Sequence, residues 1–364
     1  MSSVAAAPRE RHQRILTVLG VGYALAPVGP DATGGAEQIL SALDRGLVAA
    51  GHHSLVVAPA GSEIAGTLLA TMSLPRRFTA AARRHAEAVQ RRRIAEALAR
   101  FAVDLVHCHG LDFAEHLPPS AVPTLVTLHL PAEFYPAAAL ARPATWFNCV
   151  SAAQQARFPP LPGMLPAIDN GVPLERLEAR HARRGFALAL GRICPEKGFH
   201  LALEAAASAR VPLLIGGAVF PYRAHRRYFR RQIVPRLGAA ARFLGPLDFI
   251  RKRRFLSAAR CLLVPSLVAE TSSLVAMEAI ACGTPVVAFP AGALCDIVEP
   301  GVSGFLVADV REMAEAIHAA AGLDRERCRA AARRRFSQHH MIARYLALYE
   351  RFARRDLPEM PCCA

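Results

Sequence analysis

Two glutamates eight residues apart stand in the segment CLLVPSLVAETSSLVAMEAIACGTPVVA, residues 261–288. Glu270 follows an apolar, strand-like run, and the three small polar residues after it are placed to open a helix. The start of a helix exposes unpaired backbone N–H groups, which bind phosphate or sugar oxygens. We therefore expect the backbone at this point to hold an anionic or polyhydroxylated ligand. The residues concerned are Thr271, Ser272 and Ser273.

Glu278 is the less expected carboxylate of the two. Its neighbours three and four residues away along a helix are all apolar, and they are Leu274, Val275, Ala281 and Cys282. A carboxylate on such a face is costly unless something hydrogen-bonds to it. A ribose diol would donate one hydrogen bond to each oxygen, whereas the simpler alternative is a solvated glutamate at a helix edge.

The octapeptide GRICPEKG, residues 191–198, carries two cations directly after an apolar run. Arg192 can bind a diphosphate through bidentate geometry, and Lys197 can bind it as a point charge. Lysine is rare in this chain, because only Lys197 and Lys252 among its 44 basic residues are lysines. Ligands of open α/β sheets gather at the carboxyl ends of strands, which favours a diphosphate site over a surface turn with incidental charges.

In the first half of the chain, glycines and histidines follow predicted strands. Gly34 and Gly35 open the first predicted helix, either as its cap or as a place where a ligand approaches the backbone closely. His107, His109 and His129 all follow strands and are expected on one rim. Any one of them is more simply a packed or solvated histidine, and His129 is the best candidate to reach a cleft.

These residues need a scaffold, and the hydrophobic pattern predicts one. Short apolar runs alternate with helical periodicity through both halves of the chain, which indicates two parallel sheets with helices on both faces. A Pro-rich connector places the boundary near residues 157–171. The predicted strands are residues 15–19, 54–58, 104–110, 124–130 and 147–151, then 186–191, 212–217, 242–245, 261–266, 285–289 and 304–307.

The formal net charge of +15 suggests a polyanionic partner such as nucleic acid, anionic membrane or a phosphorylated substrate. Because the charge comes almost entirely from arginine beside abundant alanine, a GC-rich genome explains part of it. No apolar run approaches the roughly 18 residues of a spanning helix. The first fourteen residues carry arginines without a following apolar segment, so no secretion signal is expected. We expect a cytoplasmic protein.

The nine cysteines are scattered along the chain, apart from the adjacent Cys362 and Cys363. Their odd number and mostly apolar neighbours fit buried thiols in a reducing compartment. No spacing suggests zinc, and no metal cluster is expected.

Together the motifs resemble those of family-4 retaining glycosyltransferases of the GT-B fold, over roughly residues 14–350. The motifs that carry the resemblance, in chain order, are GGAEQILSALDRGLVAAGH, DLVHCHG, TLHLP, CVSAAQQARF, IDNGV, GRICPEKG, AETSSLVAMEAIACGTPVVAF and EPGVSGFLV. The resemblance implies two Rossmann-like domains that face each other across a cleft. It implies an acceptor-side domain at 1–165, a nucleotide-sugar donor domain at 166–338, and a helix with tail at 339–364 that crosses back.

The resemblance also assigns roles to the candidate residues. Arg192 and Lys197 would bind the donor diphosphate, and Glu278 the ribose. Glu270 would meet the sugar hydroxyls, and His129 would lie beside the reacting sugar; these two are the catalytic candidates. The remaining contacts to sugar and phosphates would come from Gly34 and Gly35 and from the backbone of Thr271, Ser272, Ser273 and Leu274.

Three positions depart from the family pattern. After Glu270 the family usually has an aromatic residue and a glycine, where this chain has Thr271 and then serines. Pro173 replaces the usual aspartate after NGV, and TLHL replaces a histidine followed by a polar residue. None of these removes a charged donor ligand, but the serines put the usual donor sugar in doubt.

The expected reaction is transfer of a sugar from a nucleotide-diphosphate sugar, as co-substrate, to an acceptor hydroxyl on a glycan, a lipid-linked molecule or a small molecule. No two aspartates stand two apart, so the metal-binding DxD pattern is missing from the sequence and no metal or other cofactor is expected. Cations and a helix N-terminus would stabilise the departing diphosphate instead.

A basic stretch at residues 76–100 has two interpretations, one of which is contact with a membrane. Arg77, Arg84 and Arg91 recur at seven-residue intervals on one predicted helix. The stripe is either a solvated face or a peripheral contact with anionic lipid at the inner face of the membrane, beside a lipid-linked acceptor.

Other function classes fit less well. A dinucleotide oxidoreductase would need a third glycine where Leu25 stands, and an acid at the tip of the second strand. A nucleic-acid-binding protein would rest only on RYFRR and RKRRF at 227–231 and 251–255, without a recognition motif. A sugar-nucleotide epimerase of the same fold stays open, and product analysis would separate it from a transferase.

Overall fold

The computed structural model describes residues 14–75, 77–118, 121–179 and 181–356. Some expectations from the sequence concern residues outside these ranges, namely residues 1–13, Arg76 and the pair Cys362 and Cys363. No described helix is long and apolar enough to cross a membrane.

The first half of the chain forms a six-stranded parallel sheet in the order β3-β2-β1-β4-β5-β6. Its helices begin where the sequence changes from strand to helical periodicity. The elements are β1 (Thr17–Val21), α1 (Gly35–Ala49), β2 (His53–Ala58), β3 (Thr67–Ala70), α2 (Ala80–Arg100), β4 (Leu105–Cys108), β5 (Thr124–Leu128), α3 (Ala137–Leu140), β6 (Thr145–Cys149) and α4 (Ala152–Gln155).

The second half repeats this architecture, with a parallel sheet in the order β12-β11-β10-β7-β8-β9. A π-helical turn (Phe229–Ile233) follows α7, and a short 3₁₀ turn, η3 (Pro195–Lys197), follows β7. The elements are α5 (Leu174–Leu177), β7 (Ala187–Leu190), α6 (Phe199–Ser208), β8 (Leu213–Gly216), α7 (Arg223–Tyr228), β9 (Ala241–Gly245), α8 (Phe249–Ala258), β10 (Cys261–Val264), α9 (Leu274–Ala281), β11 (Val286–Ala288), α10 (Leu294–Ile297), β12 (Gly304–Leu306), α11 (Val310–Ala319), α12 (Arg325–Arg335) and α13 (Gln338–Arg354).

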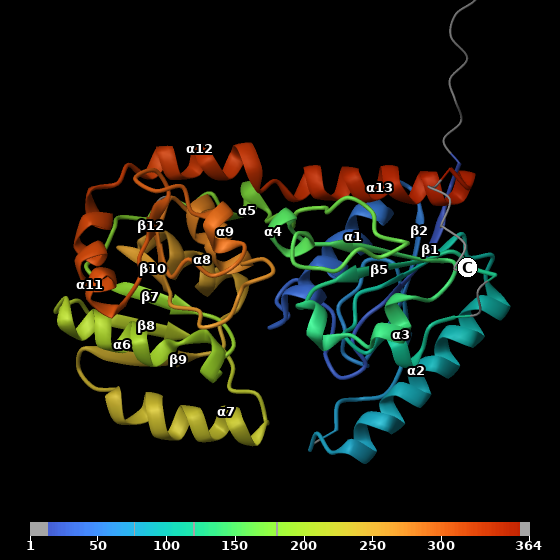
Figure 1. The fold of residues 1–364 in the computed structure, drawn as a ribbon, viewed down its shortest axis with the longest axis horizontal. Helices are drawn as coiled ribbons and strands as arrows, with labels where there is room; N and C mark the ends of the chain where they lie inside the picture. Colours follow the sequence, from blue (N-terminus) through green and yellow to red (C-terminus); the bar gives the residue numbers. More distant parts are fainter. Residues whose placement is uncertain (1–13, 76, 119–120, 180, 357–364) are drawn as a thin grey trace, which may run out of the picture.

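The predicted fold class is confirmed: two Rossmann-like parallel sheets with helices form two lobes side by side (Figure 1). In each sheet the strand order reverses direction at one point, between β1 and β4 in the first and between β7 and β10 in the second. Ligands of such sheets bind in the crevice at the carboxyl ends of these strands. The topology therefore predicts that the loops after β1, β4, β7 and β10 carry the site.

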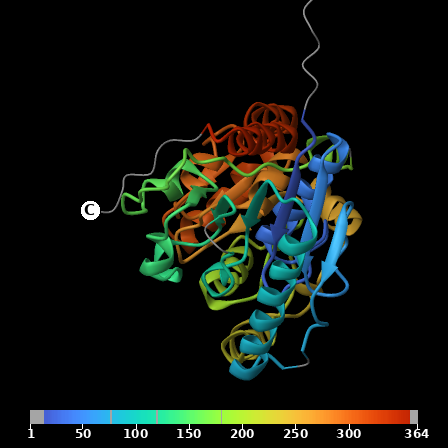
Figure 2. The same ribbon diagram turned by 90° about the vertical axis from the view of Figure 1, so that its right-hand side faces the viewer.

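The last helix, α13, returns from the second lobe to the first and lies over it (Figures 1 and 2). Its apolar face buries Met341, Tyr345, Tyr349 and Phe352 in the core formed with β1 and α1. Phe352 meets Trp146 of β6 edge to face, with ring centroids 5.1 Å apart. Burying aromatic side chains of this size stabilises the lobe by roughly 1.5–3 kcal/mol each. The last helix is therefore part of the core of the first lobe.

The chain passes from the first lobe to the second between β6 and β7. Leu165 and Ile168 still pack in the core of the first lobe. Val172 then pairs with Ser337 through a backbone bridge, so the two crossings of the chain lie next to each other. The division into domains at residues 165 and 338 stays a prediction.

Candidate functional site

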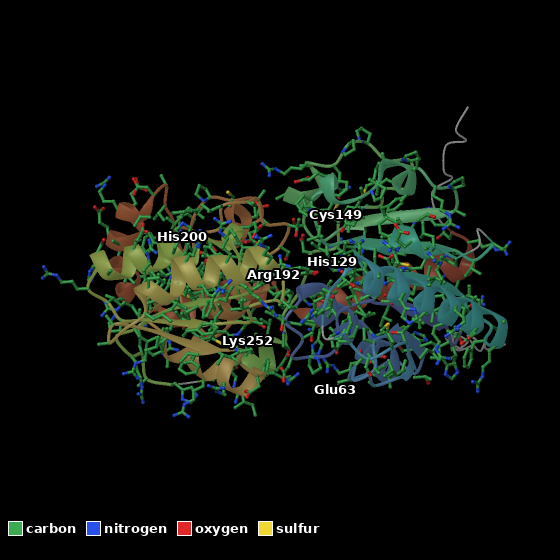
Figure 3. All side chains as sticks on the ribbon, turned by 90° about the horizontal axis from the view of Figure 1, so that it is seen from below. Glu63, His129, Cys149, Arg192, His200 and Lys252 are labelled. Carbon is green, nitrogen blue, oxygen red and sulfur yellow. The ribbon has the colours of Figure 1, made fainter. Side chains whose placement is uncertain are left out.

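A cleft of about 790 Å³ lies between the two lobes, and both lobes contribute to its walls. This volume is typical of a site for a small organic ligand. Figure 3 shows His129 of the first lobe and Arg192 of the second near the junction of the lobes. Ten of the eleven predicted site residues line the cleft: Gly34, Gly35, His129, Arg192, Lys197, Glu270, Thr271, Ser272, Ser273 and Leu274.

The centre of the donor-side wall is an ion pair between Lys197 and Glu270. The Lys197 Nζ lies 2.6 and 2.7 Å from the two carboxylate oxygens of Glu270, which is buried. The two residues follow β7 and β10, the strands that flank the reversal of strand order. The structure therefore brings together a cation and a carboxylate that are 73 residues apart in the chain.

Two glycines hold this pair in place. Gly198 has φ +63°, and a Cβ there would collide with the carbonyl oxygen of Pro265. Gly292 has φ +61°, and a Cβ there would meet the backbone of Glu270. Glycine adopts such left-handed conformations without strain, so each loop can pack directly on its neighbour. The geometry of the Lys197–Glu270 pair is thus fixed by the backbone on both sides.

Arg192 stands at the same wall and is exposed toward the cleft. Its guanidinium lies 5.7 Å from the centroid of the Phe220 ring, within the range of a cation–π contact. Across the cleft, burial raises the pKa of Glu37 above its ordinary value, and the nearby charge of Arg192 opposes this only in part. Glu37 was not predicted from the sequence, because a glutamate in the first turn of a helix is common and indicates no particular function.

Thr271 connects the two lobes. Its hydroxyl donates to the backbone carbonyl oxygen of His129 at 2.8 Å, and its own carbonyl accepts from the Ser151 hydroxyl at 2.6 Å. The neighbouring Ser272 hydroxyl is buried and has no hydrogen-bond partner among the described residues. The first of the unusual residues after Glu270 therefore joins the lobes, and the second lines the cleft with its hydroxyl buried.

The helix after Glu270 begins later than the sequence suggested. Thr271 and Ser272 precede it, Ser273 is its N-cap, and the first helical residue of α9 is Leu274. The Ser273 side chain makes no capping hydrogen bond. Backbone N–H groups of the first turn of α9 thus face the cleft without a side-chain cap, as an anion site requires.

Glu278 lies apart from the other predicted residues. Lys252 of α8 donates to its Oε1 at 2.5 Å, whereas its Oε2 is buried without a partner among the described residues. Lys252 therefore supplies the hydrogen bond that the apolar setting requires for one oxygen, and the ribose contact of the other oxygen stays a prediction. Glu278 lines a separate cavity of about 30 Å³, beside the cleft-lining residues Pro30 and Gln38 of the first lobe.

Lys252 is a residue beside the candidate site to which the sequence assigned no role. Its rarity as a lysine was the only signal, since nothing in the sequence shows that α8 faces α9. Figure 3 shows Lys252 within the second lobe, and its side chain is only 14 % exposed. A cation and a carboxylate that are both buried must pair, because either alone would carry a large desolvation cost.

A chain of hydrogen bonds joins His129 to the last helix. His129 Nε2 lies 3.0 Å from His109 Nδ1, His109 Nε2 lies 3.3 Å from His107 Nδ1, and His107 Nδ1 lies 2.7 Å from the Tyr349 hydroxyl. The Thr127 hydroxyl donates to Asn148 and accepts from His107 Nε2 at 2.7 Å.

These contacts select one tautomer of each ring. Since His107 Nε2 donates to Thr127, its Nδ1 must accept. His109 then donates from Nε2 and accepts at Nδ1, because the opposite assignment would bring two lone pairs together. His129 is left with a proton on Nε2 and a free lone pair on Nδ1.

Removing the Tyr349 hydroxyl tests this network. Tyr349→Phe keeps the ring in the core but removes the donor to His107, and we expect the free energy of unfolding to fall by about 1–3 kcal/mol. The measurement is urea unfolding of the full chain. Tyr222→Phe, at an exposed residue outside this network, is the comparison variant. Equal stability of Tyr349→Phe and wild type would show that the bond contributes nothing.

The histidines also predict how stability depends on pH. Burial lowers the pKa of His107 and His109 well below the ordinary value and lowers the pKa of His129 to about 3. Each is neutral in the folded state, so its contribution is complete above the unfolded-state pKa of about 6.5 and is lost as pH falls below it. Burial also raises the pKa of Asp112 to about 7 and the pKa of Glu37 above its ordinary value, which has the opposite effect, whereas it lowers the pKa of His116 to about 4, which adds to the effect of the three histidines.

We therefore expect the free energy of unfolding to fall between pH 6.5 and pH 4, by about 1.4 kcal/mol per pH unit for each uncompensated proton. Urea unfolding at a series of pH values measures this slope. In the His129→Asn variant, the slope of the free energy of unfolding against pH should decrease by the amount that corresponds to about one proton. A stability that does not change over this range would contradict the buried, neutral state of the three histidines.

Models of known protein families match both lobes of the chain. The family model described as glycosyl transferases group 1 matches residues 185–321. The model described as glycosyltransferase family 4 matches residues 33–176. Between them the two matches span all eleven site residues predicted from the sequence.

Curated relatives match over part of their length. D-inositol 3-phosphate glycosyltransferase 2 of Catenulispora acidiphila is 37 % identical over 170 residues, 40 % of this chain and 39 % of that protein. D-inositol 3-phosphate glycosyltransferase of Mycolicibacterium paratuberculosis is 33 % identical over 220 residues, 54 % of this chain and 50 % of that protein. The matched part of the chain spans half or less of these relatives.

Solved structures share the whole fold. Sucrose-phosphate synthase from Thermosynechococcus elongatus has a TM-score of 0.76 at 21 % identity, covering 93 % of this chain and 100 % of that one. Anabaena HepE in complex with UDP-glucose has a TM-score of 0.73 at 20 % identity, covering 92 % and 100 %. At these identities the likeness establishes a shared two-lobed fold.

Proposed function

The chain belongs to the group 1, family 4 glycosyltransferases, and from this membership we propose that it transfers a sugar from a nucleotide-diphosphate sugar to an acceptor hydroxyl with retention of configuration. The observation that carries the proposal is the Lys197–Glu270 ion pair at the wall of the cleft. Its cation suits a diphosphate and its carboxylate suits sugar hydroxyls. HepE, which shares the fold, was solved with UDP-glucose, and this supports a nucleotide-sugar donor.

On binding, the donor diphosphate takes the place of Glu270 as the anionic partner of Lys197. Arg192 adds a second cation, and the first turn of α9 adds N–H groups. Glu270 is thereby released to accept hydrogen bonds from sugar hydroxyls. We place the ribose at the free Oε2 of Glu278, held in place through Lys252, which requires the small cavity beside Pro30 and Gln38 to open into the cleft when the donor binds. The donor therefore forms its hydrogen bonds with protein groups that are already in position before it binds.

In the reaction, the bond between the anomeric carbon and the diphosphate oxygen breaks, and a bond from the acceptor oxygen forms on the same face. The proton of the acceptor hydroxyl passes to the departing diphosphate. The fixed cations stabilise the charge that develops on the leaving group, which is the largest single contribution to many such reactions. His129, with Nδ1 as an acceptor, positions a sugar hydroxyl beside the reacting carbon.

No metal ion takes part in this scheme, and donor turnover should persist in excess EDTA. Arg192 and Lys197 supply the positive charge that a divalent ion supplies elsewhere. A loss of turnover in EDTA that is restored by Mg²⁺ would contradict this part of the proposal.

The acceptor is proposed only as a hydroxyl compound. The curated relatives are named for D-inositol 3-phosphate, which makes inositol phosphates the first acceptors to test. A lipid-linked acceptor with peripheral membrane contact remains an alternative. Several arginines of α2 already have partners, since Arg83 pairs with Glu87 and Arg91 donates to the Glu115 carbonyl. Fewer charges are thus free for lipid than the sequence suggests, and co-sedimentation with anionic liposomes tests the contact.

Thermal shift with UDP, GDP, ADP and NAD, followed by incubation with the matching sugar nucleotides, tests the proposal. We expect one diphosphate to raise the melting temperature, and its sugar nucleotide to release free nucleotide with the anomeric configuration of the sugar retained in the product. An interconverted sugar nucleotide with no release of nucleotide would identify an epimerase and overturn the proposal. Stabilisation by NAD alone would also overturn it.

A further inference from the structure

Three side chains of types that bind metal ions meet beside the loop that carries Arg192 and Lys197. They are Cys194 and Glu196, from the loop after β7, and His225 of α7. Each offers one ligand atom, and these three atoms all lie within 4.8 Å of one another. Thiolate, imidazole and carboxylate are the ligands that zinc takes in proteins.

The cluster is separate from the donor site. None of its three residues lines the cleft, whose walls here come from Gly191, Arg192 and Lys197. Cys194 is fully buried, and Glu196 is exposed. An ion can therefore enter from the solvent on the Glu196 side without passing through the cleft.

The surroundings of His225 give independent support for a bound ion. The residue is 9 % exposed, and its Nδ1 is buried without a hydrogen-bond partner among the described residues. Its ring is held between aromatic neighbours, at centroid distances of 5.1 Å from Tyr222 and 6.3 Å from Phe220. A buried polar atom without a partner is costly, and a bound ion would remove that cost.

We propose that Cys194, Glu196 and His225 form a zinc-binding site with water as the fourth ligand. Tetrahedral bonds of about 2.0–2.3 Å require ligand atoms about 3.5 Å apart, so ligand atoms that now lie within 4.8 Å of one another need to close by about 1 Å at most. The exposed side chain of Glu196 can make this movement. The Cys194 thiol now lies 3.5 Å from the carbonyl oxygen of Arg192; on binding it gives its proton to solvent and the thiolate takes the metal.

The ion would link two segments that shape the donor wall. The loop 191–198 carries the proposed diphosphate ligands, and residues 220–222, just before α7, also line the cleft. Zinc bound to Cys194, Glu196 and His225 ties these segments together from behind. The site is thus a structural support of the donor wall and lies off the reaction path, so it is compatible with a metal-independent transfer.

Cobalt substitution tests the site directly, because a Co²⁺–thiolate bond gives a charge-transfer absorption that carboxylate or imidazole ligands alone do not. The full-length protein is freed of metal, titrated with Co²⁺, and then titrated with Zn²⁺ to displace it. We expect one equivalent of Co²⁺ to produce the thiolate band and one equivalent of Zn²⁺ to remove it. Cys194→Ser should abolish the band, and His225→Ala should weaken Zn²⁺ binding at least tenfold.

Two control variants exclude other thiols. Cys295→Ser removes the exposed free cysteine of the described residues, and a Cys362→Ser, Cys363→Ser double variant removes the adjacent pair near the end of the chain. Both should keep the band. Its persistence in Cys194→Ser, its loss in either control, or the absence of any Co²⁺ binding by the wild type would overturn the proposal. The readout is binding alone, so the outcome is independent of the glycosyl-transfer proposal.

Discussion

Replacing Lys197 with methionine is expected to lower kcat/KM for the donor by about 10²–10³-fold, the loss typical of removing one fixed group that stabilises a developing negative charge. Methionine keeps roughly the length of the side chain and removes its charge and its N–H donors. The measurement is steady-state release of nucleotide from the sugar donor. Arg334→Met is the matched control, because it removes an exposed cation that also forms an ion pair, with Glu299. Its kcat/KM should equal that of the wild type.

The same substitution separates binding from folding. The Lys197 side chain is 31 % exposed and lines the cleft, whereas the Glu270 side chain is only 7 % exposed, so loss of the lysine leaves a largely buried carboxylate without its partner and should lower the melting temperature. An inactive Lys197→Met protein that still unfolds cooperatively above the assay temperature supports a role in donor binding. Unchanged turnover would refute the assignment of the diphosphate site.

Replacing Lys252 with methionine is expected to lower the free energy of unfolding by about 3–5 kcal/mol, because it leaves the Glu278 carboxylate buried without its partner. Both side chains are largely buried, at 14 % and 3 % exposure, so solvent cannot compensate. Urea unfolding measures the loss. Arg311→Met breaks an exposed pair with Glu315 and should change stability by less than about 1 kcal/mol.

A double variant, Lys252→Met with Glu278→Met, tells stability and donor binding apart. Apolar pairs of similar volume often match or exceed a buried ion pair in stability, so the double variant should regain most of what Lys252→Met loses. The affinity of the double variant for the donor should be lower than that of the wild type, because the free carboxylate oxygen of Glu278 is gone. A double variant that binds the donor like the wild type would leave the Lys252–Glu278 pair with a structural role only.

Most of the fold could be predicted from the chain because its strands are short apolar runs between helices with clear periodicity. The strand β3 was missed: TLLA is a four-residue edge strand that is only partly buried, so its pattern is weak. The start of α9 was also placed early, because small polar residues suit both a helix start and the loop before it.

The site was predictable where motifs follow strands, and not where partners come from distant elements. Arg192, Lys197 and Glu270 follow β7 and β10, and parallel strands bring their carboxyl ends to one edge. Nothing local links Lys252 to Glu278, 26 residues later, or His107 to Tyr349, 242 residues later. Such pairs depend on which helix faces which strand, and that follows from packing of the whole chain.

The central claim is that the cleft binds a nucleoside diphosphate through Lys197. Isothermal titration calorimetry of the preferred nucleoside diphosphate, in EDTA, tests it most directly. The account predicts one site per chain for the wild type and for Arg334→Met, and an affinity at least tenfold weaker for Lys197→Met. Equal affinity of Lys197→Met and wild type, or no binding of any nucleoside diphosphate, would contradict it.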